Sequence, residues 1–294
     1  MHILVFGKNG QVAQSLRDEA GSVSLKSFGS ADCDLREPGA GAAAIANASA
    51  DIIINATAYT AVDAAEKDRN AAQRLNTDAP TELAAAATKS GARFIHLSTD
   101  YVFDGDPKSR HNVAYTENEK TAPLNVYGAT KRAGEIAVLS AAPDAIIIRT
   151  SWVFSRYGSN FVKTMLGAGA TQRQLKIVDD QIGGPTPARD IARAILAIAS
   201  KIHRGAAGDG IYHYQGTPTV SWADFATEIF TVAGLSVDVQ KIPSGAYPTV
   251  ARRPLRTALD CGRIERDFGI SAPDWRPGLH QVIDALRETR RPNA

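Results

Sequence analysis

The chain has 294 residues, 44% of them apolar and 22% charged, which is typical of a globular protein that can bury a sizeable core. Lysine and arginine number 33 against 31 acidic residues, a formal net charge of +2, and no basic block is present that would follow a nucleic-acid backbone or a membrane surface. Cys33 and Cys261 lie far apart and form no CxxC or Cys/His cluster, which argues against a disulfide framework and a zinc site and fits a reducing compartment.

The N-terminal sequence MHILVFG lacks the charged segment and apolar core of a signal peptide. No apolar run approaches the ~18 residues of a membrane span. We therefore expect a cytoplasmic protein that binds neither nucleic acid nor a membrane.

Short apolar runs alternate with longer helical patterns along the first 200 residues. The runs rich in Ile, Val and Phe have the length of parallel strands buried on both faces: 2–6, 23–28, 51–56, 93–98, 145–150 and 176–178. The Ala- and Leu-rich stretches between and after them are predicted helices: 11–20, 76–90, 126–140 and 188–201. This alternation predicts an α/β fold with a doubly wound parallel sheet.

The turn after the first predicted strand reads GKNGQVA. Gly7 permits a tight turn, and Gly10 lets backbone amides approach a pyrophosphate at the start of the next helix. A glycine turn is weak evidence alone, but its place at the start of a parallel α/β pattern indicates nucleotide binding. The predicted cofactor-binding residues here are Gly7, Gly10, Gln11 and Val12.

The domain organisation follows from these patterns. Residues 1–150 are expected to form a Rossmann domain for NAD(P), to which the strand and helix at 176–203 return. A Gly/Ala linker at 205–210 precedes a helix at Trp222–Ala233 and two short C-terminal helices. Residues 151–175 and 204–294 are therefore expected to form mainly a smaller C-terminal α/β substrate-binding region. The long loops 100–124 and 151–175 are either functional or contain a helix.

The end of the second predicted strand bears on the choice between NADH and NADPH. An acid at this tip would bond the adenosine ribose of NAD. The sequence reads FGSAD, with Gly29 and Ser30 at the tip and Asp32 too far along the chain. This favours NADPH, but no arginine stands at the tip to hold a 2′-phosphate, so the use of NADH stays open.

Tyr127 and Lys131 lie four residues apart in NVYGATKRAGE and share one face of a predicted helix. A lysine ammonium beside the phenol can lower its pKa from about 10, and the phenol can then exchange a proton with a carbonyl or an alcohol. Ser98 and Thr99 end the fourth predicted strand, at the edge where open α/β sheets bind ligands. The spacing alone is common on helix surfaces, but together with the glycine turn and these hydroxyls it indicates a catalytic set.

Several longer motifs carry a resemblance to a known family. The motifs are GKNGQVA, INATAYTAVDAAE, LSTDYVFDG, PLNVYGATKRAGE, IIIRTSWVF and DQIGGPTPARDIA. In this order they resemble the extended short-chain dehydrogenase/reductases and, within them, the dTDP-4-dehydrorhamnose reductase family. The resemblance implies a Rossmann domain that holds NADPH and a C-terminal part that binds a nucleotide-sugar. It also implies that Tyr127 donates a proton, Lys131 binds the nicotinamide ribose and Thr99 orients the sugar.

Further positions match the family with less specific motifs. Those expected to contact the cofactor are Asp34 and Leu35 at the adenine and Ala58, Tyr59 and Thr60 after the third strand. Those expected at the sugar are Trp152 and Asp100. Loop position and chemistry alone suggest that Asn160 and the turn 183–186 touch the diphosphate and that Arg253 pairs with a phosphate through its guanidinium fork.

The chain departs from the family pattern at Ala13, where glycine is common, in one loop and at a metal position. The loop 104–122, with Lys108, Arg110 and His111, is longer than usual. Some family members bind Mg²⁺ through glutamates at a dimer contact, but Ser15 stands where the first would fall, and Asp190 alone does not make a site. We therefore predict no metal and expect a monomer or a homodimer.

The resemblance implies that NADPH reduces the C4 keto group of dTDP-4-dehydro-β-L-rhamnose to give dTDP-L-rhamnose. One alternative is another nucleotide-sugar epimerase, dehydratase or reductase of the same superfamily. Dehydratases usually place an Asp-Glu pair beside the strand-four threonine, and here Asp100 and Tyr101 follow Thr99. The second alternative is a catalytically silent regulatory subunit, which would not need the intact set of Thr99, Tyr127 and Lys131.

Overall fold

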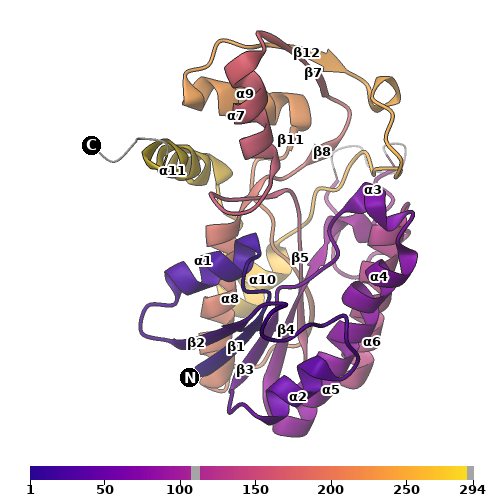
Figure 1. The fold of residues 1–294 in the computed structure, drawn as a ribbon, viewed down its shortest axis with the longest axis vertical. Coiled ribbons are helices and arrows are strands. Elements are labelled where there is room, and N and C mark those ends of the chain that lie inside the picture. Colours follow the sequence, from indigo (N-terminus) through magenta and orange to yellow (C-terminus); the bar gives the residue numbers. More distant parts are fainter. Residues whose placement is uncertain (107–112, 290–294) are drawn as a thin grey trace.

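The centre of the protein is a six-stranded parallel sheet with the strand order β10-β5-β4-β3-β1-β2 (Figure 1). A computed structural model describes residues 1–106 and 113–289. The strands are β1 (His2–Phe6), β2 (Ser24–Phe28), β3 (Ile52–Asn55), β4 (Arg93–Thr99), β5 (Ile146–Thr150) and β10 (Gly210–His213). The chain runs from β1 outward to β2 and then crosses back to β3 on the other side of β1. This reversal creates a crevice at the carboxyl ends of β1 and β3.

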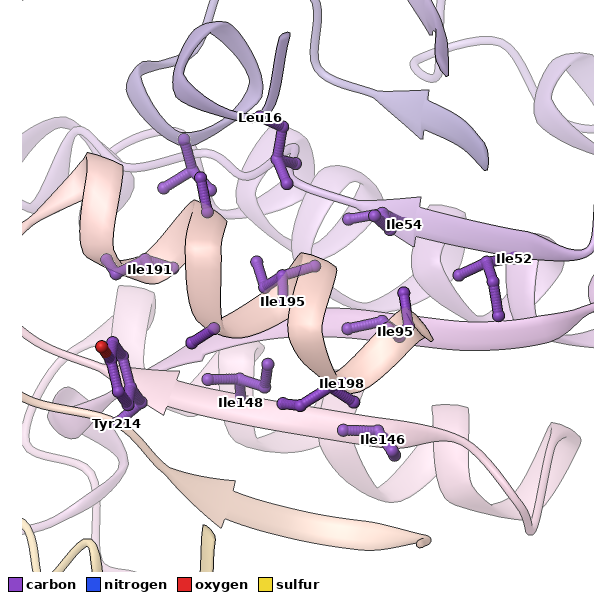
Figure 2. Close-up of a cluster of buried hydrophobic side chains, with 14 of the residues drawn as sticks. Leu16, Ile52, Ile54, Ile95, Ile146, Ile148, Ile191, Ile195, Ile198 and Tyr214 are labelled. Atoms are coloured by element: carbon purple, nitrogen blue, oxygen red, sulfur yellow. The ribbon is translucent and has the colours of Figure 1, made fainter. Parts of the chain in front are cut away.

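Helices cover both faces of the sheet because successive residues of each strand point to opposite sides. Ile3 and Val5 of β1 face α1 (Gln11–Glu19) and α8 (Ala188–His203), and Figure 2 shows the isoleucines of α8 packed against those of β3, β4 and β5. Leu4 and Phe6 face the opposite layer. That layer consists of α2 (Ala40–Ala46), α5 (Ala79–Ser90) and α6 (Val126–Ala141). The doubly wound parallel sheet predicted from the sequence is confirmed.

One predicted strand does not join this sheet. β7 (Gln174–Val178) instead pairs in parallel with β12 (Asp238–Ile242) in a separate two-stranded sheet. Its alternate residues Gln174 and Lys176 are exposed, and only Ile177 is buried, so this strand could not be covered on both faces. The place beside β5 is taken by β10, whose Tyr212 and His213 are buried. The prediction that a strand at 176–178 returns to the main sheet was therefore wrong, whereas α8 does pack on it.

The C-terminal region has its own apolar core, built mainly by three helices at the top of Figure 1. They are α7 (Phe161–Thr171), α9 (Trp222–Ala233) and α11 (Trp275–Glu288). α7 lies within the predicted loop 151–175, so this loop does contain a helix. The short strand pairs here are β6 (Val153–Phe154) with β9 (Thr186–Pro187) and β8 (Ile182–Gly183) with β11 (Val220–Ser221). α10 (Gly262–Phe268) packs back on the main sheet.

Three further helical segments lie between β3 and β4. They are α3 (Val62–Ala65), α4 (Arg69–Gln73) and a π-helical turn at Arg74–Asp78 that continues into α5. Within residues 1–106 and 113–289, no helix is both long and apolar enough to cross a membrane.

Two glycines let α6 approach its neighbours closely. A Cβ at Gly134 would lie 2.1 Å from the carbonyl oxygen of Asn76, and one at Gly128 would lie 2.2 Å from that of Tyr101. Both distances are far below van der Waals contact with backbone atoms that cannot move alone. The glycines of NVYGATKRAGE therefore fix the position of the helix that carries Tyr127 and Lys131.

This close packing predicts opposite effects for two glycine-to-alanine changes inside helices. Gly134→Ala should lower the free energy of unfolding by about 1–3 kcal/mol because α6 must move away from Asn76. Gly167→Ala, in the exposed face of α7 with no atom within 4 Å, should raise it by about 0.5–1 kcal/mol. Urea unfolding of both variants measures the difference. Equal effects at the two positions would contradict this account of α6.

Candidate active site

The glycine turn after β1 closes tightly against β2 and β3. The amides of Gly7 and Lys8 donate to the carbonyl oxygen of Phe28 at 2.9 and 3.0 Å. Gly7 has a φ of +118°, and a Cβ there would lie 2.9 Å from the carbonyl oxygen of Ala56. Gly10 precedes α1, and no described side chain caps this helix. The first amides of α1 are thus free to bind an anion, as the sequence suggested.

A hollow of about 190 Å³ lies beside this turn, at the carboxyl ends of β1 and β2. Its lining includes Gly7, Phe28, Ser30, Asp34 and Leu35. This lining combines apolar and polar side chains, which suits an adenosine group, and the residues expected at the adenine do line one pocket. Asp34 itself is engaged by Arg36, whose Nε and Nη2 donate to its carboxylate at 3.0 and 2.7 Å.

Asp32 lies closer to the end of β2 than its place in the sequence suggested. Its Oδ2 accepts from the amide of Gly29 at 3.0 Å and from Nζ of Lys8 at 3.2 Å. These two hydrogen bonds, the one from the backbone first, lower the pKa of Asp32. The expectation that Asp32 lies too far along the chain to reach the tip was therefore wrong, because the chain turns back after Ser30 and brings the carboxylate to the amide of Gly29 and to Lys8.

The hydroxyls at the end of β4 meet the start of α6. Thr99 is followed directly by buried Asp100, whose carboxylate accepts from Oγ1 of Thr99 at 3.1 Å and from Oγ1 of Thr257 at 2.5 Å. Thr99 also lies near enough to the phenol of Tyr127 to influence its pKa. Asn125 caps α6 by accepting from the amide of Gly128 at 2.8 Å, which places Tyr127 in the first turn of the helix. The structure thus brings Thr99, Asp100 and Tyr127 together.

The phenol of Tyr127 is held in its protonated form. Burial raises the pKa of Tyr127 to about 12, the nearby hydroxyl of Thr99 acts in the opposite direction, and the charge of Asp100 raises the pKa further. The ring of Tyr101 lies edge-on to it, with 5.6 Å between the ring centroids. The sequence led us to expect that the ammonium of Lys131 lowers the pKa of Tyr127. In the structure the pKa is raised instead, because desolvation of the phenol is the largest effect.

Lys131 points into the sheet rather than toward a solvent-exposed surface. Its side chain is 1% exposed, and Nζ donates to the carbonyl oxygen of Leu97 at 2.6 Å and lies 3.3 Å from Nε2 of His96. Burial lowers the pKa of Lys131 to about 8, while the charge of Glu135 raises it. Lys131 and Tyr127 do lie in the same helix, but the amine is bonded to β4.

Glu135 continues the series Tyr127 and Lys131 by one more helical turn, and the sequence analysis missed it. Its carboxylate is fully buried and accepts from Nε and Nη2 of Arg149, both at 2.7 Å, and from Oγ of Ser98 at 2.6 Å. The spacing of four residues would have placed it on the same face of the helix. Its buried partner on β5 could not be inferred from spacing.

A larger hollow of about 680 Å³ opens between the two regions. Its lining includes Leu124, Gln181, Tyr247 and Arg253. Arg253 donates to both carboxylate oxygens of Asp63, at 3.3 and 2.8 Å. The predicted phosphate-binding arginine therefore lines a cavity of suitable size, although Asp63 occupies part of its guanidinium fork. Asp63 was not identified as a functional residue from the sequence.

Two residues expected at the substrate have structural contacts instead. Asn160 caps α7, and its Nδ2 donates to Oε1 of Gln11 at 2.9 Å. Gln11 also donates to the carbonyl oxygen of Val153 at 3.2 Å, so its side chain ties the glycine turn to the loop after β5. Trp152 has a positive φ of 44° and stacks on Trp222 with 3.4 Å between ring centroids. Their roles at the substrate remain predictions.

The remaining predicted positions are placed as follows. Tyr59, in the segment Ala58–Thr60 after β3, is fixed by Asn76, which accepts from its amide at 2.8 Å. The turn at 183–186 lies against Trp152, because a Cβ at Gly183 would be 2.7 Å from that ring. Lys108, Arg110 and His111 of the longer loop lie outside the described residues.

Ser15 and Asp190 line a separate hollow of about 480 Å³ that is bordered by α1, α8 and α11. Among the described residues, no group of three or more His, Cys, Asp or Glu side chains could hold a metal ion. The expected absence of a metal stays a prediction.

Comparison with known proteins agrees with this geometry. A family model described as RmlD substrate binding domain matches residues 1–288. A dTDP-4-dehydrorhamnose reductase of Sinorhizobium fredii is 43% identical over 293 residues, which cover 97% of this chain and 98% of the relative.

Solved structures give the same result. A dTDP-4-dehydrorhamnose reductase of Clostridium acetobutylicum is 34% identical with a TM-score of 0.90, over 98% of this chain and all of that one. The enzyme of Bacillus anthracis, solved in complex with NADP, is 32% identical with a TM-score of 0.89, over 97% of this chain and 99% of that one.

The buried carboxylate of Asp100 predicts a pH dependence of stability. Burial raises the pKa of Asp100 to about 6, so the folded protein binds more protons than the unfolded chain between about pH 4 and 6. This contribution is present below pH 4 and is lost as the pH rises through 6. In the wild type this lowers the free energy of unfolding as the pH rises from 4 to 7. In Asp100→Asn, which cannot titrate here, that fall should be smaller by about 1–3 kcal/mol. Urea unfolding at pH 4 to 7 measures it, and parallel curves for variant and wild type would contradict it.

Proposed function

The chain belongs to the RmlD substrate binding domain family, and on this premise we propose that it reduces the C4 keto group of dTDP-4-dehydro-β-L-rhamnose with NADPH, giving dTDP-L-rhamnose. The observation that carries the proposal is the proximity of Thr99, at the carboxyl end of β4, to Tyr127 of α6, the helix that also bears Lys131. The names of the relatives and the NADP complex of the Bacillus anthracis enzyme support the substrate and the cofactor.

The residues around the glycine turn fit a dinucleotide. The free amides at the start of α1 suit the pyrophosphate, and Gly7 leaves no side chain in its path. The hollow that includes Asp34 and Leu35 suits the adenosine. The carboxyl ends of β3 and β4, with Ala58 to Thr60 and Lys131, then lie where the nicotinamide half would reach. When bound, NADPH supplies the hydride that is added to C4.

The nucleotide-sugar fits the hollow between the two regions. A volume of about 680 Å³ is in the range of small-molecule sites, and its walls come from both regions. Arg253 supplies a cation for the diphosphate, and its bond to Asp63 holds the guanidinium in place. Leu124 lines the hollow and lies three residues before Tyr127 in the chain, so we place the sugar at this end, toward the phenol.

Tyr127 acts as the proton donor. Its raised pKa of about 12 keeps the phenol protonated at neutral pH, so a proton is available when hydride addition turns the keto oxygen into an alkoxide. The hydroxyl of Thr99 donates to Asp100 in the free site, and it can turn to the substrate oxygen. Stabilisation of the charge that develops on O4 is the main task of these two residues.

Unpaired cysteines support a reducing location. Cys33 and Cys261 are both free thiols. We propose the cytoplasm as the location, since it is a reducing compartment in which unpaired thiols persist.

The proposed function is tested with a panel of nucleotide 4-keto-6-deoxysugars, each offered with NADPH or NADH while nicotinamide absorbance is followed. We expect turnover with the dTDP-linked 4-dehydrorhamnose. Tyr127→Phe should lower this turnover by about 10²–10⁴-fold, the usual contribution of a general acid, and leave the Kd for NADPH nearly unchanged. Turnover within a factor of two of wild type would refute the role of Tyr127, and no turnover of any sugar by the wild type would refute the function.

The charges at the end of β2 predict how cofactor choice changes. We expect kcat/KM for NADPH to exceed that for NADH by about 2- to 50-fold. Asp32→Asn removes a negative charge and frees Lys8 for a 2′-phosphate, so it should raise this ratio by about 3- to 10-fold, or roughly 0.7–1.4 kcal/mol. Ser30→Asp should lower the ratio by repelling the phosphate and bonding the ribose. Ratios that do not move in opposite directions would show that this tip does not contact the ribose.

A further inference from the structure

A chain of buried polar side chains leads from the loop after β3 to the amine of Lys131. Oδ1 of Asn55 accepts from the amide and from Oγ1 of Thr57, at 3.0 and 2.6 Å. Nδ2 of Asn55 lies 3.1 Å from Nδ1 of His96, and Nε2 of His96 lies 3.3 Å from Nζ of Lys131. Asn55 and His96 are fully buried. The chain therefore joins the last residue of β3 to a residue of the catalytic set, beneath the active site.

The direction of these hydrogen bonds is fixed at the Thr57 end. The backbone amide of Thr57 can only donate, so the atom of Asn55 that faces it must be the oxygen. Nδ2 of Asn55 then donates to Nδ1 of His96, which must accept. Burial keeps the pKa of His96 well below its usual range, so the ring is neutral and carries one proton. That proton is on Nε2, the nitrogen that faces Lys131.

This tautomer places a donor against the lysine. A charged ammonium at Nζ would face the Nε2–H of His96 as one donor against another. An uncharged amine can accept from Nε2–H through its lone pair and still donate to the carbonyl oxygen of Leu97, 2.6 Å away. The geometry of His96 thus opposes the charge on Lys131, in addition to the cost of burying that charge.

The other charged groups near α6 have partners of their own. Glu135, one turn further along α6, is bonded by Ser98, Arg149 and Arg132, and its negative charge favours the ammonium form. Those on the elements packed against the helix are Asp100 with Thr257, Glu66 with the amide of Val126, Asp63 with Arg253, and Arg74 with Glu82. Glu135 and the His96 chain therefore act on Lys131 in opposite directions.

We propose that Asn55 and His96 are positioning residues that oppose the charge on Lys131, so that this lysine exchanges its proton within the working pH range instead of remaining a permanent cation. The proposal rests on the proposed function for its role in the reaction. A lysine that changes charge can give or take the proton of a neighbouring active-site hydroxyl, whereas a permanent ammonium can only stabilise negative charge. Asn55 acts through His96 and His96 through Lys131, and neither is assigned a contact with the substrate.

The tautomer of His96 is the first test, and it needs neither substrate nor turnover. Long-range ¹H–¹⁵N spectra of ¹⁵N-histidine-labelled wild-type protein should show His96 neutral, with the proton on Nε2 and none on Nδ1. A His96→Gln variant assigns the signals. A ring protonated on Nδ1, or on both nitrogens, would overturn the proposal. An unreactive protein with the expected tautomer would instead refute only the proposed function.

The second test is the charge on Lys131 itself. In protein labelled with ¹³C at lysine Cε, the Lys131 signal, assigned by its absence in Lys131→Met, is titrated from pH 6 to 11. In Asn55→Asp the new carboxylate accepts from Nδ1–H of His96, so Nε2 loses its proton and can accept from the ammonium of Lys131. The titration of Lys131 should then move upward by about one pH unit or more. Asn55→Ala frees Nδ1 of His96 without adding a charge and should move it in the same direction by a smaller amount.

A control variant separates the effect of the hydrogen-bond direction at His96 from the effect of an added negative charge. Asn76→Asp adds a carboxylate at another buried asparagine, which bonds Tyr59 and Thr130 beside the same helix but not His96. It should shift the Lys131 titration less than Asn55→Asp. Upward shifts in both Asn55 variants support the proposal. A shift in Asn55→Asp that Asn76→Asp matches, with none in Asn55→Ala, would reduce the effect to an added charge and overturn it.

Discussion

The buried ion pair between Glu135 and Arg149 is the interaction on which the arrangement of the active site depends. Two bonds of 2.7 Å join the carboxylate of α6 to the guanidinium of β5, and neither side chain has more than 1% of its surface exposed. Ser98 adds a bond from the end of β4, and Nη1 of Arg149 lies 3.3 Å from Nε2 of His213 on β10. A buried charge is tolerated only with full compensation, so any rotation of α6 would leave two charges unpaired. Tyr127 and Lys131 lie on the same helix and are oriented by the same constraint.

The second constraint is the junction between the two regions, because the candidate site is built from both. Thr257 bonds Asp100, and the carbonyl oxygen of Arg252 accepts from Nδ2 of Asn125 at 2.8 Å. Asp63 binds Arg253, and Glu66 accepts from the amide of Val126 at 2.8 Å. The motif TAVDAAE is thus explained by its contacts: its two acids hold the C-terminal region and the start of α6.

The sequence was informative where a pattern is local or repeats with the period of one element. The apolar runs of β1 and β3, the glycine turn at Gly7 and the spacing of Tyr127 and Lys131 all depend on neighbours in the chain, and the structure has each in its expected element. In β7 the polar residues Gln174 and Lys176 alternate with apolar ones, which is a local sign that one face of this strand stays exposed. Its partner is β12, more than 60 residues away, and no local pattern identifies that pairing.

Contacts between residues that are far apart in the chain also could not be predicted from the sequence. Asp32 reaches the end of β2 only because the chain turns back after Ser30 and Lys8 of another loop meets it. Asn160 has a residue type that suits a phosphate, yet its amide is bonded to Gln11, 149 positions earlier. The chemistry of a side chain was readable from the sequence, but its partner was not, and the partner decides whether the group is free to bind a ligand.

Desolvation has a clear effect on a buried phenol that serves as the acid of the proposed reaction. In water a phenol with a pKa near 10 is a weak donor, and raising the pKa to about 12 by burial makes it weaker toward water still. The acceptor in the proposed reaction is an alkoxide, which is far more basic than either value, so the proton still moves downhill once hydride has been added. Before that moment the high pKa prevents loss of the proton and keeps a negative charge from forming next to Asp100. A phenol made acidic by a permanent cation would lose that protection, and this is consistent with a lysine whose amine is bonded to β4 rather than to the phenol.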